Sequence, residues 1–268
     1  MAFPFIVWAF IFTIVPIILI VYYSLTVQTE DGLAFSWSNY VRAFEPVFLM
    51  VIWRSIVLAS IATIICFLVG YPVAYIMASK EYSTKGFLLF LLLVPMWMNF
   101  LLRTYAWIAI LENNGIINTI LRTIGLRTLD LLYNDQAVVL GMVYNFLPFM
   151  ILPVYTVLKR MDQSLIEAAQ DLGANNRQVF IKLILPLSMP GILSGVTMVF
   201  MPALTTFIIP SLLGGGQFLL IGNLIERQFL LANDWHFGSA LSVMLMLMVI
   251  VVVGIFSRVE RASEGGLF

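Results

Sequence analysis

Long runs of apolar residues alternate with short polar segments along the whole chain. A helix needs about 20 mostly apolar residues to cross a membrane. Six runs approach or exceed that length: Phe3–Val27, Ser55–Ala78, Phe87–Leu111, Ala137–Leu158, Ile192–Leu213 and Phe237–Phe256. The first run lacks a preceding basic region and exceeds the about 7–15 apolar residues of a signal peptide, so we expect a retained span. The pattern predicts an all-α integral membrane protein with six transmembrane helices, forming one domain over residues 1–268.

One polar segment, residues 159–190 between the fourth and fifth runs, is long and has a helical pattern. Ser164 and Glu167 have the spacing of a capping box, which starts a helix. Gly173 can end that helix in the left-handed conformation, and Asn175 or Asn176 can cap a second one. The apolar positions of the first helix recur at helical spacing and are Leu165, Ala168, Ala169 and Leu172. The segment therefore predicts two short helices joined at a glycine.

Two interpretations of this helical hairpin are open. It can lie along the lipid headgroups, or it can dock on a partner protein. Glu167 and Asp171 make the first helix acidic, which suits anionic lipid poorly. Its small, alanine-rich stripe also suits close approach of a protein surface, so the pattern favours docking.

Composition limits the chemistry that the chain can perform. It is 62% hydrophobic and 10% charged, whereas a soluble domain has about 25% charged residues. Lys+Arg and Asp+Glu number 14 each, so there is no overall basic signature for nucleic acid. The chain has one cysteine, Cys66, and one histidine, His236, too few for a catalytic triad or a zinc site. With no phosphate-binding loop either, we expect a non-catalytic chain without cofactor or metal.

The basic residues of the loops predict the orientation, because cytoplasmic loops carry an excess of Lys and Arg. One set of loops contains Lys80, Lys85, Lys159, Arg160, Arg177, Lys182, Arg258 and Arg261. The opposite set contains Arg42, Arg54, Arg122, Arg127 and Arg227. We therefore expect both termini and the polar segment 159–190 to be cytoplasmic.

Polar and aromatic residues inside the spans are candidates for a translocation path, because burying them in lipid is costly. At about 1.5 Å per residue, Trp97 and Asn99 fall near mid-bilayer in the third run, and Tyr105 follows them. Asn145 falls near the middle of the fourth run. Trp107 is more typical of an interface anchor. No Asp or Glu lies deep in a run, which argues against a proton- or sodium-coupled transporter.

The predicted outer loops contain more acidic than basic residues. The acids are Glu30, Asp31, Glu45, Glu112, Asp130, Asp135, Glu226 and Asp234. Aromatic faces attract desolvated ammonium groups by about 1–2 kcal/mol each. The mildly acidic outer side and the aromatic residues of the third run weakly favour a cationic solute.

The polar segment carries a motif of known type. Glu167-Ala168-Ala169, Gly173 after three residues and Leu185-Pro186 further on resemble the EAA loop of ATP-binding-cassette (ABC) importer permeases. This chain departs from the pattern only at Leu183, where the family has isoleucine. The resemblance implies the type I (MetI-like) permease architecture. It also implies that these six residues couple the spans to a separate ATPase dimer.

The resemblance extends over most of the chain. Leu91–Trp107, Tyr144–Tyr155, Ile209–Ile225 and Asp234–Ala240 are similar to blocks of the permeases of spermidine/putrescine importers, the PotB type. The resemblance implies a bacterial inner-membrane protein that forms half of a polyamine pore. It implies a second homologous permease and an extracytoplasmic solute-binding protein as further partners.

Other functions stay open at this point. An ABC permease for another solute, such as ferric ion, thiamine or an organic anion, would share many of these features. A stand-alone secondary transporter or channel would need inverted repeats and functional charges at mid-membrane, which we do not find in the sequence. A membrane scaffold would leave the EAA-type segment and the mid-span polar residues unexplained.

Overall fold

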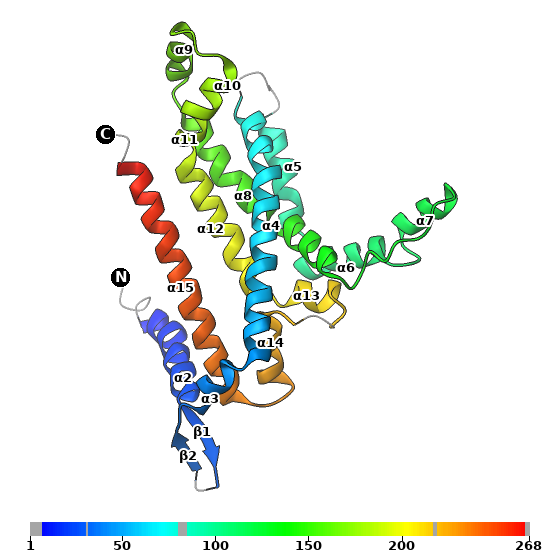
Figure 1. The fold of residues 1–268 in the computed structure, drawn as a ribbon, viewed down its shortest axis with the longest axis vertical. Coiled ribbons are helices and arrows are strands. Elements are labelled where there is room, and N and C mark those ends of the chain that lie inside the picture. The colour runs from blue at the N-terminus through cyan, green and yellow to red at the C-terminus, as the bar shows by residue number, and fades with distance from the viewer. Residues whose placement is uncertain (1–6, 31, 80–84, 217–218, 266–268) are drawn as a thin grey trace.

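The computed structural model describes residues 7–30, 32–79, 85–216 and 219–265. These residues form a helical protein with one small hairpin (Figure 1). The N-terminal part comprises η1 Phe10–Ile14, α2 Val15–Ser24, β1 Thr26–Thr29, β2 Gly32–Phe35, α3 Ser38–Ala43 and α4 Pro46–Ala78. The middle comprises α5 Lys85–Trp97, α6 Phe100–Leu111, α7 Ile116–Thr123, α8 Asp135–Arg160, α9 Gln163–Asp171 and α10 Asn176–Val179. The last part comprises η2 Phe180–Ile184, α11 Leu185–Leu187, α12 Met189–Thr205, α13 Ile208–Leu213, α14 Ile221–Leu230 and α15 Trp235–Gly265.

The predicted all-α membrane fold is confirmed. Among the described residues, four helices are long and apolar enough to cross a membrane: Val7–Ser24, Pro46–Ala78, Asp135–Arg160 and Trp235–Arg258. Two further spans result if each of two bent helix pairs counts as one. One pair is α5 with α6 and α7, bent by 92°, and the other is α10–α11 with α12, bent by 60°.

The core of the protein lies between α4, α8 and α12, which run side by side (Figure 1). Met150 of α8 is fully buried between two glycines. A Cβ added at Gly70 of α4 would lie 3.0 Å from Met150 Cγ, and one at Gly195 of α12 would lie 2.8 Å from its Sδ. Small residues allow such close approach of membrane helices. The two glycines therefore allow these three helices to pack closely around the Met150 side chain.

The third apolar run, Phe87–Leu111, is not the continuous helix that its composition predicts. The helix ends at Trp97 and resumes at Phe100 in a perpendicular direction. The Asn99 side chain accepts a hydrogen bond from the Leu101 backbone N–H at 2.8 Å and so caps the new helix. An asparagine four residues after Pro95 is a local helix-start signal, and it outweighs the uniform hydrophobicity of the run.

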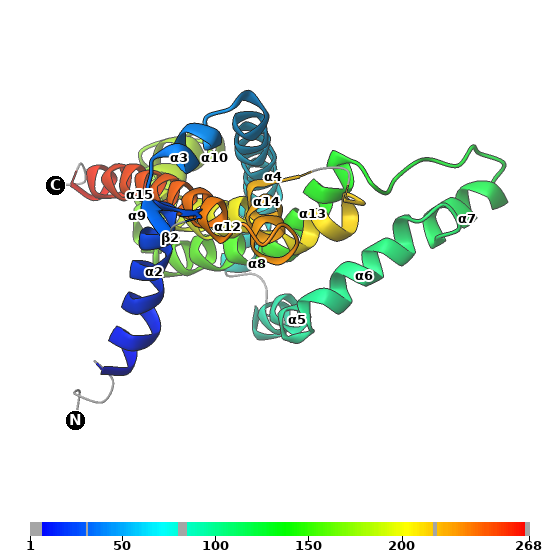
Figure 2. The same cartoon turned by 90° about the horizontal axis from the view of Figure 1, so that it is seen from below.

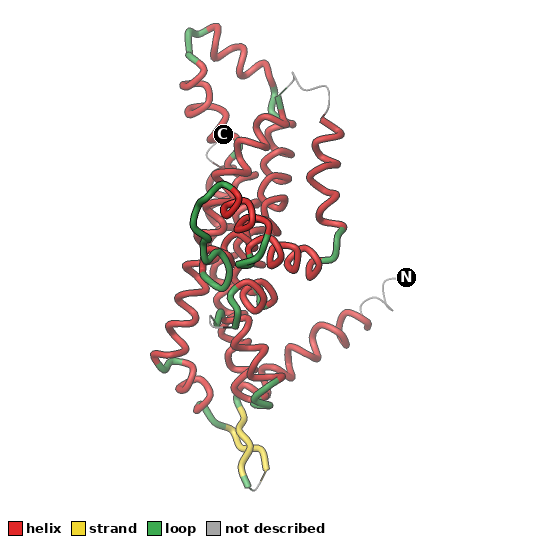
Figure 3. The backbone as a smooth tube through the Cα atoms, turned by 90° about the vertical axis from the view of Figure 1, so that its right-hand side faces the viewer, coloured by secondary structure: helices red, strands yellow, loops and turns green. Residues whose placement is uncertain are grey.

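Other span boundaries also differ from the prediction. The helix of the first run ends at Ser24, and β1 and β2 then pair antiparallel, with Thr26 opposite Phe35. The fifth run breaks after Thr205, and α13 follows as a separate short helix. Figure 3 shows the hairpin projecting from the end of the molecule opposite to α9 and α10.

The N-terminal segment is anchored to α15 at the end of the molecule that carries the β-hairpin. His236 Nδ1 lies 3.1 Å from Thr26 Oγ1 and 3.2 Å from the Tyr23 carbonyl. The Tyr40 hydroxyl donates to Ser24 Oγ at 2.8 Å. His236 is therefore packed at a helix junction. The α2 helix itself remains largely exposed within this chain.

Candidate coupling segment and translocation path

The segment predicted to couple to an ATPase forms the helical hairpin expected from its sequence, but its first helix starts differently. Asp162 is the N-cap of α9, and its carboxylate accepts from the Ser164 backbone N–H at 2.9 Å. The predicted capping box between Ser164 and Glu167 is therefore wrong. Asp is as good an N-cap as Ser. Asp162 lies two residues after the end of α8 and starts α9 two residues earlier than Ser164 would.

Gly173 ends α9 as predicted. Its φ is +83°, in the left-handed region. The Gly173 N–H donates to the Gln170 carbonyl at 2.8 Å, and the Ala174 N–H donates to the Ala169 carbonyl at 3.0 Å. These two bonds satisfy carbonyls that the helix end leaves free. A Cβ at Gly173 would meet no atom within 4 Å, so the constraint there is backbone conformation and not space.

Asn175 caps the second helix, one of the two alternatives that the sequence left open. Its side chain accepts from the Gln178 backbone N–H at 2.9 Å, while the Gln178 side chain accepts from the Asn175 N–H at 3.0 Å. This reciprocal pair is a capping box. The turn between α9 and α10 is therefore fixed by local hydrogen bonds.

The two faces of α9 differ from the predicted stripe. Ile166 and Ala169 pack against the core. Leu165, Ala168 and Leu172 instead lie exposed, and Leu172 is 89% exposed. Glu167 and Asp171 share the exposed surface with them. We call these five residues the free face of α9; it combines small apolar groups with two carboxylates and has no cover within the described chain.

The second half of the hairpin is anchored to the spans. Val179 and Ile184 are buried. The Phe180 ring meets Tyr71 and Tyr75 of α4 edge-on, with ring centroids 5.9 and 5.7 Å apart. Leu185 and Pro186 then continue the chain toward α12. A force on this part of the hairpin would therefore be transmitted directly to α4 and α12.

A cavity of about 800 Å³ lies beneath α9, between that helix and the ends of α4 and α8. Its lining includes Tyr75, Lys159, Gln163, Ile166 and Val179. The α9 helix thus stands partly away from the bundle, while α10 and η2 are packed on it.

The four residues predicted for the translocation path are placed in two different environments. We call the bend between α5 and α6 the elbow (residues 97–100). Trp97 and Asn99 lie in the elbow and are exposed, Trp97 by 77%. Tyr105 lies just beyond it in α6 and is also exposed. Asn145 is only 3% exposed, and its amide donates to the Gly141 carbonyl at 2.8 Å. Asn145 therefore faces the interior of this chain and does not join the others on an open surface.

The role expected for Trp107 as an interface anchor does not match its position. Its ring packs against Tyr144 of α8 with a centroid separation of 5.3 Å. Tyr144 lies in the middle part of α8, between Asp135 and Arg160. Trp107 therefore packs between helices. Its partner comes from a distant part of the chain, which the sequence pattern around Trp107 does not reveal.

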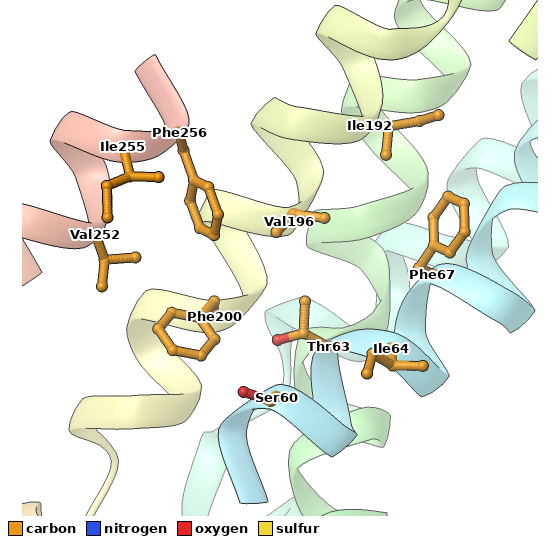
Figure 4. Close-up of a pocket in the computed structure, with 10 residues that line it drawn as sticks. All are labelled: Ser60, Thr63, Ile64, Phe67, Ile192, Val196, Phe200, Val252, Ile255 and Phe256. Carbon is orange, nitrogen blue, oxygen red and sulfur yellow. The ribbon is translucent and has the colours of Figure 1, made fainter. Parts of the chain in front are cut away.

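An open groove of about 510 Å³ lies between α4, α12 and α15. Figure 4 shows its lining, which is almost entirely aliphatic and aromatic and includes Phe67, Phe200 and Phe256. The one threonine, Thr63, donates its hydroxyl to the Ala59 carbonyl at 2.7 Å. Because its lining offers no carboxylate, this groove is a poor candidate for binding a polycation.

The architecture is that of a multi-pass membrane protein with a helical hairpin at one end, and the comparisons with known proteins give its class. The family described as "Binding-protein-dependent transport system inner membrane component" matches residues 70–264. The spermidine/putrescine permease protein PotB of Haemophilus influenzae is 40% identical over 95% of this chain and 91% of its own length. PotB of Escherichia coli is 37% identical over 95% of this chain and 94% of its own. The chain therefore belongs to the binding-protein-dependent transport permeases, and within them to the PotB family.

Solved structures share the fold. A chain from the crystal structure of a bacterial ABC transporter involved in alginate import has a TM-score of 0.81. It is 18% identical, with 97% of this chain and 93% of that chain covered. A chain from the inward-facing MetNI methionine ABC transporter has a TM-score of 0.60 and 17% identity, covering 85% of this chain and 97% of its own. The type I permease architecture expected from the sequence is confirmed.

Proposed function

We propose that this chain is the permease subunit of an ATP-driven importer and forms half of a translocation pore for polyamines. The observation that carries the proposal is the match to PotB over nearly the full length of both chains. In that assembly, ATP is bound and hydrolysed by a separate ATPase dimer. An extracytoplasmic binding protein delivers the solute.

The free face of α9 supports a role in coupling. Glu167, Ala168 and Leu172 project from a helix whose other side packs on the bundle. Exposed leucine and alanine next to carboxylates fit a cleft in a partner protein better than anionic lipid. Gly173 sets the direction of this helix, and Leu185–Pro186 join the hairpin to α12. Closure of the ATPase would therefore move α9 and, through Phe180, α4.

The orientation supports the same assembly. The basic residues Lys159, Arg160, Arg177 and Lys182 all lie in or beside the helical hairpin, which favours a cytoplasmic position. The β-hairpin at the opposite end would then be extracytoplasmic, and both termini would be cytoplasmic. An ATPase can reach α9 only in this orientation.

Exposed aromatic and amide groups at the elbow support a path for an organic cation. Trp97 and Tyr105 offer aromatic faces, and Asn99 offers a carbonyl that also caps α6. Asn145, the fourth residue proposed for the path, is buried and donates to the Gly141 carbonyl. Two of the outer acids are paired in this structure: Asp135 with Arg54 at 2.6 Å and Asp234 with Arg42 at 2.8 Å. Each pair also uses one of the outer basic residues, so the pairing leaves the outer excess of acids over bases unchanged.

Uptake in cells that lack their own polyamine importers tests the solute class. Cells that express this chain with its partner subunits should accumulate labelled spermidine or putrescine, and unlabelled polyamine should compete. Ferric ion, thiamine and organic anions should not compete. Transport of one of these solutes in place of polyamine would be consistent with a permease but would refute the proposal that its solute is a polyamine.

A further inference from the structure

A second groove lies between α14, α15 and the end of α12, which are neighbours in both views of the ribbon (Figure 1 and Figure 2). Its volume is about 540 Å³. Most of its lining is apolar, including Leu245, Met246 and Val249 of α15. Unlike the groove between α4, α12 and α15, it also contains a carboxylate, that of Glu226 of α14. This groove therefore combines apolar surface with a negative charge.

The charge of Glu226 is not neutralised within the part of the chain that the structure describes. Its half-buried carboxylate forms neither a hydrogen bond nor an ion pair with any described residue, whereas Asp135 and Asp234 are paired with arginines. The neighbouring Arg227 donates instead to the Gly216 carbonyl at 3.2 Å. The lining of the groove contains no basic residue. The Glu226 carboxylate is therefore available to a cationic ligand.

The backbone at the end of α12 adds partial negative charge on the same side. The Thr205 and Thr206 carbonyls accept no hydrogen bond from any residue that the structure describes. Pro210, four residues after Thr206, has no N–H to donate. Free carbonyls at the C-terminus of a helix together carry about half a negative elementary charge. A Cβ at Gly222 of α14 would lie 2.6 Å from the Thr205 oxygen and 2.8 Å from the Thr206 oxygen, so α14 lies directly against these carbonyls.

The carboxylate and the carbonyls lie close enough to act on one ligand. Gly222 and Glu226 share a face of α14 and are about 6 Å apart along the helix. An ammonium group has three N–H donors and can therefore be bound by both kinds of oxygen. Phe229 lines the same groove, and aromatic rings attract ammonium groups. A divalent metal ion prefers several oxygen ligands in one shell, and only one carboxylate lines the groove, so an ammonium group fits better than a metal ion.

We infer that this groove binds a polyamine, with one ammonium group held by Glu226 and the carbonyl end of α12. The methylene chain lies on the apolar residues of α14 and α15. The inference rests on the proposed function, because it assigns the proposed solute to a site on this chain. A polyamine carries ammonium groups separated by short methylene chains, so it gains both from the charge and from the apolar lining. An inorganic cation would gain only from the charge.

Covalent trapping tests the site directly. A water-soluble carbodiimide activates accessible carboxylates and joins each to a nearby amine as an amide. The purified importer is treated with this reagent and labelled spermidine, and the modified peptides are mapped by mass spectrometry. We expect the adduct at Glu226 in preference to Glu112, an exposed glutamate outside the groove, and we expect excess putrescine to suppress it. Equal labelling of the two glutamates, or equal suppression by sodium chloride at the same ionic strength, would overturn the inference.

Uptake by proteoliposomes separates this inference from the proposed function. Glu226→Gln keeps the size of the side chain but removes its charge, so spermidine uptake should fall about two- to fivefold. Glu226→Asp should recover part of that loss, and Glu112→Gln should retain normal uptake. If Glu226→Gln transports as well as Glu112→Gln, the groove holds no ammonium group, while the proposed function is unaffected. If even the unmodified importer takes up no spermidine, the proposed function fails and the groove loses its ligand with it.

Discussion

Replacing Gly173 tests whether the direction of α9 matters for transport. Gly173 has a φ of +83°, and an L-residue in the left-handed region costs about 1–2 kcal/mol. A Cβ there would touch nothing within 4 Å, so no steric clash adds to this cost. The hydrogen bonds from Gly173 and Ala174 back to α9 would weaken together. At 1.4 kcal/mol per factor of ten, Gly173→Val should leave the docking conformation about 5- to 30-fold less populated.

The asparagine variant is the matched control. Asparagine tolerates the left-handed conformation better than other non-glycine residues, so Gly173→Asn should retain most of the activity that Gly173→Val loses. The assay is ATP-dependent spermidine uptake by proteoliposomes, with the amounts of permease and ATPase measured in the same preparation. If Gly173→Val transports normally, or if Gly173→Asn is as impaired as Gly173→Val, the backbone conformation at this position does not control coupling.

Three further predictions concern the path, the link to the spans and the orientation. Trp97→Ala should slow polyamine uptake about 5- to 30-fold by removing about 1–2 kcal/mol of cation–π attraction. Trp97→Phe should recover part of the uptake rate, and equal rates for Trp97→Leu and Trp97→Phe would exclude an aromatic role. Phe180→Ala removes the ring contacts to Tyr71 and Tyr75 and should leave ATP hydrolysis running with little uptake. If uptake and hydrolysis fall in the same proportion, Phe180 does not link the hairpin to α4. In a Cys66→Ala background, an impermeant thiol reagent added to intact cells should label Glu30→Cys and spare Arg177→Cys; the opposite labelling would invert the proposed orientation.

The all-α membrane fold and the approximate positions of its apolar helices could be predicted from the sequence, because apolar length is a direct consequence of bilayer thickness. The elbow at Asn99 could not be predicted by the same criterion. The residues on both sides of it are mostly apolar, so composition gives no sign that the direction changes. Asn99 carries a local capping signal, and only the packing of α6 against α8 and α13 decides that this signal is used.

The helical hairpin could be predicted well because its signals are local. Gly173 and Asn175 act through hydrogen bonds to residues within five positions, and such bonds depend little on the rest of the fold. The faces of α9 could not be assigned in this way. Leu165 and Leu172 resemble core residues by type, yet the bundle covers Ile166 and Ala169. Which side is covered depends on how α9 meets α4 and α8.

The position of Asn145 shows the same limit for the candidate path. Its depth in the fourth run could be estimated from residue number, but the side of α8 that faces the pore could not. Nearly every position of this helix is apolar, so no polar stripe marks a pore side. The structure turns Asn145 inward, toward the Gly141 carbonyl. Trp97, by contrast, is exposed because the helix bends immediately after it.

The central claim is that closure of an ATPase on α9 drives polyamine through this permease. The most direct test is spermidine transport by proteoliposomes that contain the purified importer. ATP is supplied on the side of the membrane that carries the ATPase, and Glu167→Lys is the variant. Glu167 lies on the free face of α9 and not in the core, so the variant should insert into the membrane but should accumulate no spermidine when ATP is supplied. The unmodified importer should accumulate spermidine only with ATP. Accumulation without ATP, or normal accumulation by Glu167→Lys, would contradict the account.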